Sequence, residues 1–137
     1  MNFSGAYSEE IGKGGKLVVT RHSWHLEYYW AGPDLRYNGT FKRVPGADID
    51  DYINAWKANF EKYLELRAAI PKGGEFVQPG AMGMQIRVHT SLGRGVCLQS
   101  YHCSVRTEQC LKEMVNSYLD AKHKASVIQR MLAEVAT

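Results

Sequence analysis

Histidine and cysteine are the residues of this sequence whose types and spacing could support metal or nucleophilic chemistry. His22 and His25 form an H-x-x-H pair near the start of the chain. The other candidates follow in its second half, at His89, Cys97, His102, Cys103 and Cys110. A metal site needs three or four such ligands to converge. We expect none here, because residues three apart on a strand point to opposite faces and the cysteine spacings match no common zinc pattern.

A cysteine and a histidine could also act as nucleophile and base. His102 and Cys103 are neighbours on an expected strand and face opposite sides, whereas Cys97 could meet His89 across a hairpin. No glycine-rich elbow, helix start or third residue is placed to activate a thiol. We therefore expect no catalytic residue and no cofactor. A small enzyme or ligand-binding domain that uses these histidines and cysteines stays open as the alternative.

The candidates for a catalytic pair of carboxylates are Asp48, Asp50 and Asp51. These residues begin a helical pattern, where acidic side chains cap free backbone N–H groups and favour the positive end of the helix dipole. Elsewhere the acids alternate with Lys and Arg on helical faces, as they do on a solvated surface. The carboxylates therefore do not indicate acid–base catalysis.

Aromatic and basic side chains are mixed in the first third of the chain. Trp, Tyr and Arg are enriched at the energetic centres of protein interfaces, and aromatic rings also stack on nucleic-acid bases. Strand alternation must bury about half of these residues in a core. The predicted partner-binding residues are Tyr29, Arg36, Tyr37, Lys42, Arg43 and Arg87.

The charge balance permits nucleic-acid binding without indicating it. Seventeen Lys and Arg against fourteen Asp and Glu give a net charge of +3, and the pI is about 8.8. Domains that bind phosphates usually carry clustered Lys and Arg and a pI above about 9, whereas these charges are spread along the chain. Nucleic acid is therefore a disfavoured partner, kept as a third hypothesis that predicts a steep salt dependence of affinity.

Composition and targeting signals indicate a globular cytoplasmic protein. The 137 residues are 45% hydrophobic and 23% charged, which is typical of a folded domain. No apolar run approaches the roughly 20 residues of a membrane span, and the N-terminus lacks the pattern of a secretory signal. Three cysteines, an odd count, favour free thiols in a reducing compartment. We expect no membrane association.

The elements that must position these residues follow from hydrophobic periodicity. Residues 1–15 end in glycines and read as a flexible lead-in. Residues 16–30 alternate with period two, with a break expected near His22, and place Val18, Trp24 and Leu26 on one side. A further strand is predicted over residues 35–44.

A second group of elements follows the same order. Residues 48–70 have the apolar spacing of an amphipathic helix. Residues 82–103 form an expected hairpin that pairs Val88 with Val96. Thr107 then caps a helix that runs almost to the C-terminus.

The order strands, helix, hairpin, helix predicts an α+β fold. We expect one domain over residues 1–137, built from an antiparallel sheet of about four to five strands with both long helices on one face. The two halves could be loosely repeated units of strands followed by a helix, although no residue-level similarity supports a repeat.

Residues 83–105, GMQIRVHTSLGRGVCLQSYHCSV, followed by a Thr-capped helix, resemble part of the small cytoplasmic immunity proteins of bacterial polymorphic toxin systems, including contact-dependent growth inhibition. The resemblance implies a non-enzymatic protein that binds and neutralises a cognate toxin domain. The surfaces of such proteins are often acidic, so the charge of +3 departs from the pattern and leaves the partner's identity open. A homo-oligomer is also compatible with the sequence.

Overall fold

The computed structural model describes residues 5–11, 15–29, 40–89, 95–97 and 105–135. These residues group into two compact units. The first unit contains the described residues within 1–49 and 118–137, and the second contains those within 50–117. Each unit combines an antiparallel sheet with a helical segment.

The sheet of the first unit contains four strands in chain order: β1 (Ala6–Ile11), β2 (Gly15–Thr20), β3 (Trp24–Tyr29) and β4 (Thr40–Pro45). All neighbours are antiparallel, and Leu17, Leu26 and Val44 lie opposite one another across three strands. Their side chains are fully buried. Strand β1 lies within residues 1–15, so this part of the expected flexible lead-in is a strand paired with β2.

The expected break near His22 is a hairpin turn between β2 and β3. The backbone N–H of Thr20 donates to the carbonyl of Ser23 at 2.8 Å. Val19 pairs with Trp24, so an odd-numbered residue of β2 lies on the same face of the sheet as an even-numbered residue of β3. The expectation that Val18 shares a face with Leu26 is therefore wrong. Period-two alternation holds within each strand and does not carry through a turn.

Helix α1 (Ile49–Ala69) follows a short 3₁₀ turn, η1 (Gly46–Asp48), and confirms the predicted helix. Asp50 and Asp51 occupy its first turn. Trp56 and Tyr63 lie in its apolar stripe and are fully buried.

The sheet of the second unit contains β5 (Glu75–Pro79), β6 (Gln85–His89) and β7 (Gly95–Cys97), with the 3₁₀ turn η2 (Ala81–Gly83) before β6. Sequence periodicity missed β5, because both of its faces are largely exposed and it lacks a clear alternation. The predicted hairpin exists in a different register: Val96 pairs with Ile86 instead of Val88. A shift of two residues keeps every side chain on its face, so alternation alone could not select the register.

Helix α2 (Glu108–Val135) begins where the sequence predicts. The hydroxyl of Thr107 accepts a hydrogen bond from the backbone N–H of Cys110 at 3.1 Å, which confirms the predicted cap. Residues 108–117 belong to the second unit and residues 118–135 to the first.

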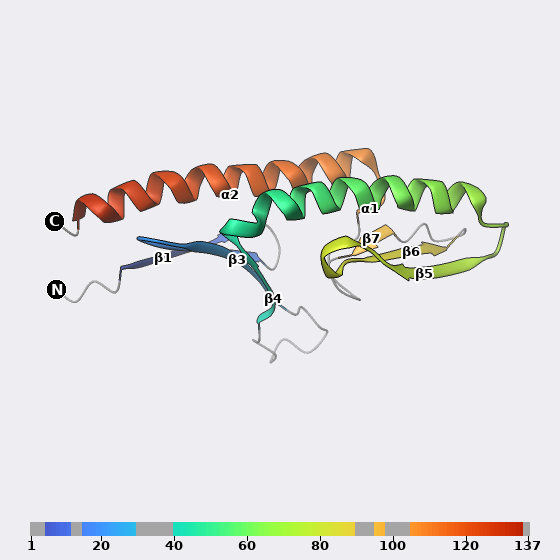
Figure 1. Ribbon diagram of the computed structural model, residues 1–137, viewed down its shortest axis with the longest axis horizontal. Coiled ribbons are helices and arrows are strands. Elements are labelled where there is room, and N and C mark those ends of the chain that lie inside the picture. The colour runs from blue at the N-terminus through green and yellow to red at the C-terminus, as the bar shows by residue number, and fades with distance from the viewer. Residues whose placement is uncertain (1–4, 12–14, 30–39, 90–94, 98–104, 136–137) are drawn as a thin grey trace. The chain divides into compact units, whose positions relative to one another are not determined.

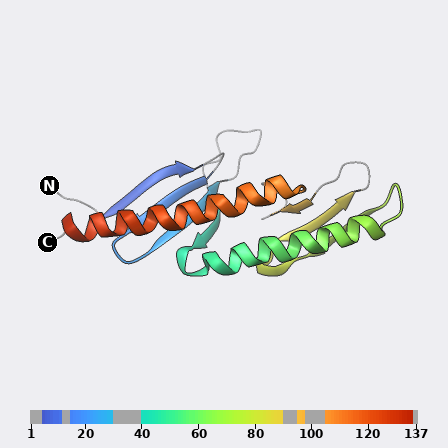
Figure 2. The same cartoon turned by 90° about the horizontal axis from the view of Figure 1, so that it is seen from above.

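Helix α1 and the C-terminal part of α2 each pack on the sheet of the other half of the chain. The C-terminal part of α2 packs on the β1–β4 sheet, where Lys124 pairs with Glu9 at 2.7 Å and the Gln129 side chain donates to the Thr20 carbonyl at 3.2 Å. Helix α1 packs on the β5–β7 sheet, where Asn59 contacts the η2 turn. Figures 1 and 2 show each helix along one face of its sheet.

The fold is therefore α+β, as predicted, with two sheets of four and three strands in place of the expected single sheet. The expectation that both helices lie on one face of one sheet is also wrong, because α1 packs on the β5–β7 sheet and the C-terminal part of α2 packs on the β1–β4 sheet. Alternation identifies a strand with one apolar face but does not state which strands share a sheet or which helix covers them. The single-domain interpretation stays a prediction. No helix in the described part of the chain has both the length and the apolar character needed to cross a membrane.

Candidate functional site

A row of four charges crosses the face of the β1–β4 sheet that is turned away from α2. The strand register places Glu10 opposite Lys16, Lys16 opposite Glu27, and Glu27 opposite Arg43. These positions alternate with buried Leu17, Leu26 and Val44 along the strands, so they lie on the other face of the sheet. We call Glu10, Lys16, Glu27 and Arg43 the charged row.

Glu27 organises one end of the charged row. Its Oε1 accepts a hydrogen bond from His25 Nε2 at 2.8 Å and pairs with Arg43 Nη2 at 3.2 Å. The Glu27 side chain is 14% exposed, whereas that of Arg43 is 61% exposed. A half-buried carboxylate thus orients a guanidinium group that still presents most of its surface to solvent. Such a group can bind a carboxylate or a carbonyl of a partner.

A second ion pair lies on the opposite face of this sheet, between Glu9 of β1 and Lys124 of α2. The hydrogen bond from Lys124, together with its positive charge, lowers the pKa of the Glu9 carboxyl below its ordinary value. The same hydrogen bond raises the pKa of the Lys124 ammonium. This pair links the edge strand β1 to α2, and we assign it a structural role.

Of the six predicted partner-binding residues, the structure describes the side chains of Lys42, Arg43 and Arg87. Arg43 lies in the charged row, but Lys42 points to the other face of β4, because neighbouring strand residues alternate. Arg87 lies on β6, in the second unit. Tyr29 ends β3, and its side chain is outside the described part of the structure. Arg36 and Tyr37 lie outside the described residues.

The histidines and cysteines within the described residues are dispersed. His22 lies exposed in the β2–β3 turn, and Cys97 is buried on β7. The register pairs Cys97 with Gln85, and His89 with Glu75 of β5, so the alternative in which Cys97 meets His89 across the hairpin does not occur. Among the described residues, no three His, Cys, Asp or Glu side chains come together as a metal site would require. His102 and Cys103 are outside the described residues.

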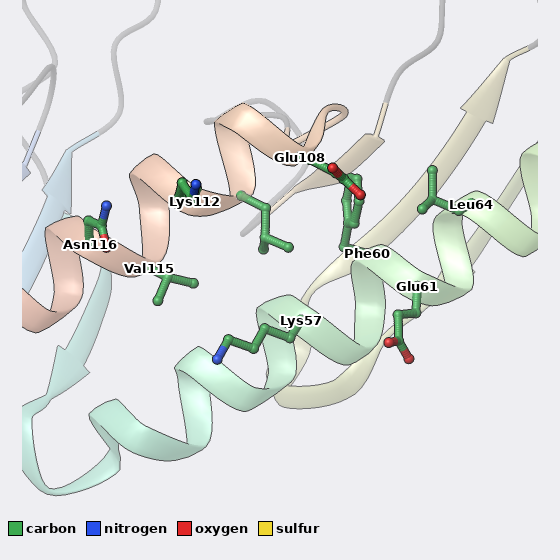
Figure 3. A pocket seen from close by; sticks show the side chains of 9 residues that line it. Lys57, Phe60, Glu61, Leu64, Glu108, Lys112, Val115 and Asn116 are labelled. Carbon is green, nitrogen blue, oxygen red and sulfur yellow. The ribbon is translucent and has the colours of Figure 1, made fainter.

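A groove between α1 and the first turns of α2, within the second unit, is a second candidate site (Figure 3). Its volume is about 520 Å³, within the range of sites that hold a small molecule or the side chains of a partner. Both apolar and charged side chains line it: Lys57, Phe60, Glu61, Leu64, Glu108, Leu111, Lys112, Val115 and Asn116. We call this feature the helix groove.

Sequence reasoning assigned the apolar residues of the helix groove to the core stripes of two helices. Phe60 is buried, but Leu64 is 39% exposed. The two helices carry the same spacing, with groove residues at positions i, i+3, i+4 and i+7 from Lys57 and from Glu108. This spacing is the signal that could have suggested a shared surface. It is also the spacing of any buried helix face, so the sequence did not distinguish a core from a groove.

Comparisons with known proteins returned no match. No protein-family model, no curated protein and no solved structure matches the chain.

Proposed function

We propose that the chain is a non-catalytic binding protein of the immunity kind, which neutralises a protein toxin domain by covering a surface that the toxin needs. The resemblance of residues 83–105 to immunity proteins motivates this function. The observation that supports a binding surface on the first unit is the charged row, in which Glu27 orients the exposed Arg43. Free thiols at Cys97 and Cys110 are compatible with the cytoplasm, where we propose that the protein acts.

The pattern of the charged row favours a protein partner over nucleic acid. Its signs alternate across the four strands, from Glu10 through Lys16 and Glu27 to Arg43. A phosphate backbone carries charge of one sign and would be repelled by the two glutamates. A protein surface can present both signs in register, and such complementarity selects a partner and speeds its association.

Charge reversal at Arg43 tests the proposal. The purified protein, Arg43→Glu and Arg43→Ala would each be used to capture partners from the lysate of the host, with the mass and stoichiometry of the retained protein measured. Arg130→Glu is the matched control, because Arg130 is an exposed residue of α2 and its reversal changes the net charge equally. We expect one polypeptide bound at one-to-one stoichiometry, about tenfold or more weaker binding by both Arg43 variants, and no loss for the control.

The immunity function requires a second measurement on the captured polypeptide. Its expression in cells should arrest growth, and co-expression of the wild-type chain should restore growth while Arg43→Glu restores it less. Circular dichroism must show that the Arg43 variants are folded. Full binding by both variants would exclude the charged row as the interface. A captured polypeptide that leaves growth unaffected, or no captured polypeptide, would refute the immunity function.

A further inference from the structure

The charges that line the helix groove are sorted by sign along its length. Lys57 and Lys112 lie toward one end, and Glu61 and Glu108 lie toward the other (Figure 3). The sorting arises because α1 and α2 run in opposite directions along the groove, and each helix places a glutamate four residues from a lysine. Within the described residues, none of these four side chains forms an ion pair.

The two lysines lie toward the same end of the groove, and so do the two glutamates, so neither helix offers the other a partner of opposite sign there. Each of the four side chains has an opposite charge only on its own helix, four residues away. A bound partner that carries acidic groups at one end and basic groups at the other would pair with all four. It must also offer apolar side chains to Leu64 and to the half-buried Leu111 and Val115.

The helix groove itself has all of these properties. When two copies face each other, a twofold axis that lies in the interface and runs across the groove places the lysines of one copy opposite the glutamates of the other. The same axis places apolar side chains opposite apolar side chains. An axis along the groove would instead place like charges together. We propose that a second copy of this chain docks on the helix groove in the antiparallel orientation and forms a homodimer. This proposal is independent of the function proposed for the charged row.

A charge-exchange experiment tests the dimer. The wild-type chain should have a mass near twice the 15.5 kDa of one chain in light scattering and sedimentation equilibrium. Lys57→Glu/Lys112→Glu makes both ends of the groove acidic, and Glu61→Lys/Glu108→Lys makes both ends basic. We expect each variant alone to associate about tenfold or more weakly, and an equal mixture of the two to form a heterodimer.

An apolar variant provides an independent test. Leu64→Glu places a charge among the apolar side chains that border the groove and should give a monomer. Met131→Glu is the matched control, because Met131 is an exposed apolar residue of α2 in the first unit, and it should leave the dimer intact. Circular dichroism must show unchanged helix content, above all for Glu108→Lys, which removes an acidic group from the first turn of α2.

Each other outcome overturns the proposal. A monomeric wild-type chain excludes the homodimer. Dimeric charge variants place the interface elsewhere, and a mixture that stays monomeric excludes the pairing of opposite charges between two grooves. If the wild type is monomeric and Leu64→Glu weakens capture of another protein, the groove belongs to that partner instead.

Discussion

Asn59 offers the sharpest test of how the second unit is held together. It is the buried polar residue on the face of α1 that meets the η2 turn, and it is 4% exposed. Its Oδ1 accepts a hydrogen bond from the Ala81 backbone N–H at 2.9 Å, and its Nδ2 donates to the Ala81 carbonyl at 3.1 Å. One amide side chain thus satisfies both backbone groups of a single turn residue.

Asn59→Ala removes both hydrogen bonds to Ala81 and a weaker one from Nδ2 to the Met84 Sδ at 3.1 Å. Ala81 is exposed, so water can reach its backbone, and each lost bond should cost about 1 kcal/mol, near the low end of the range for an unsatisfied group. The space left by the amide should cost about 1 kcal/mol more. The higher helix propensity of alanine offsets about 0.5 kcal/mol of this loss in stability. The free energy of unfolding should therefore fall by about 2–3 kcal/mol.

Urea unfolding followed by circular dichroism and tryptophan fluorescence measures this loss. Asn54→Ala is the matched control, because Asn54 is exposed on the same helix and its substitution changes only helix propensity. The control should be about 0.5 kcal/mol more stable than the wild type. If Asn59→Ala were less than about 1 kcal/mol below this control, the proposed role of the two hydrogen bonds would be refuted.

Three further predictions concern single contacts. The pKa of Glu9 is lowered from 4.5 in the folded state, so its pair with Lys124 stabilises the fold above pH 4.5. This stabilisation is lost as the pH falls through the pKa of Glu9 in the folded protein. Glu9→Gln should therefore reduce the fall in the free energy of unfolding that acid titration measures. Gly46→Ala would drive a methyl group into the Trp24 ring and should lower the melting temperature, whereas an unchanged value would contradict this packing. Thr107→Ala should cost about 1 kcal/mol in urea unfolding and Thr107→Ser almost none.

Sequence reasoning succeeded where the deciding interactions are local. The cap at Thr107, the two long helices and the break near His22 depend on residues within a few positions of one another. Capping hydrogen bonds, helical spacing and strand alternation act over this range, so the sequence carries their signal directly.

It failed where a choice depended on a distant partner. The pairing of Val96 with Ile86 and the exchange of faces at the β2–β3 turn could not be selected by alternation, which is satisfied equally by several registers. Glu27 gave no signal of its own, because its role depends on Arg43, sixteen residues away on the neighbouring strand.

The sequence by itself determined the α+β class, the order of most elements and the residues with an apolar face. Only the tertiary structure decided that the strands form two sheets, that α1 and the end of α2 each cover the sheet of the other half of the chain, and that Leu64 borders a groove. The physical reason is that an apolar stripe shows that a face must be buried but does not identify the segment that buries it. That segment is determined by packing between parts far apart in the chain. Because hydrophobic burial is non-directional, several segments could satisfy the same pattern.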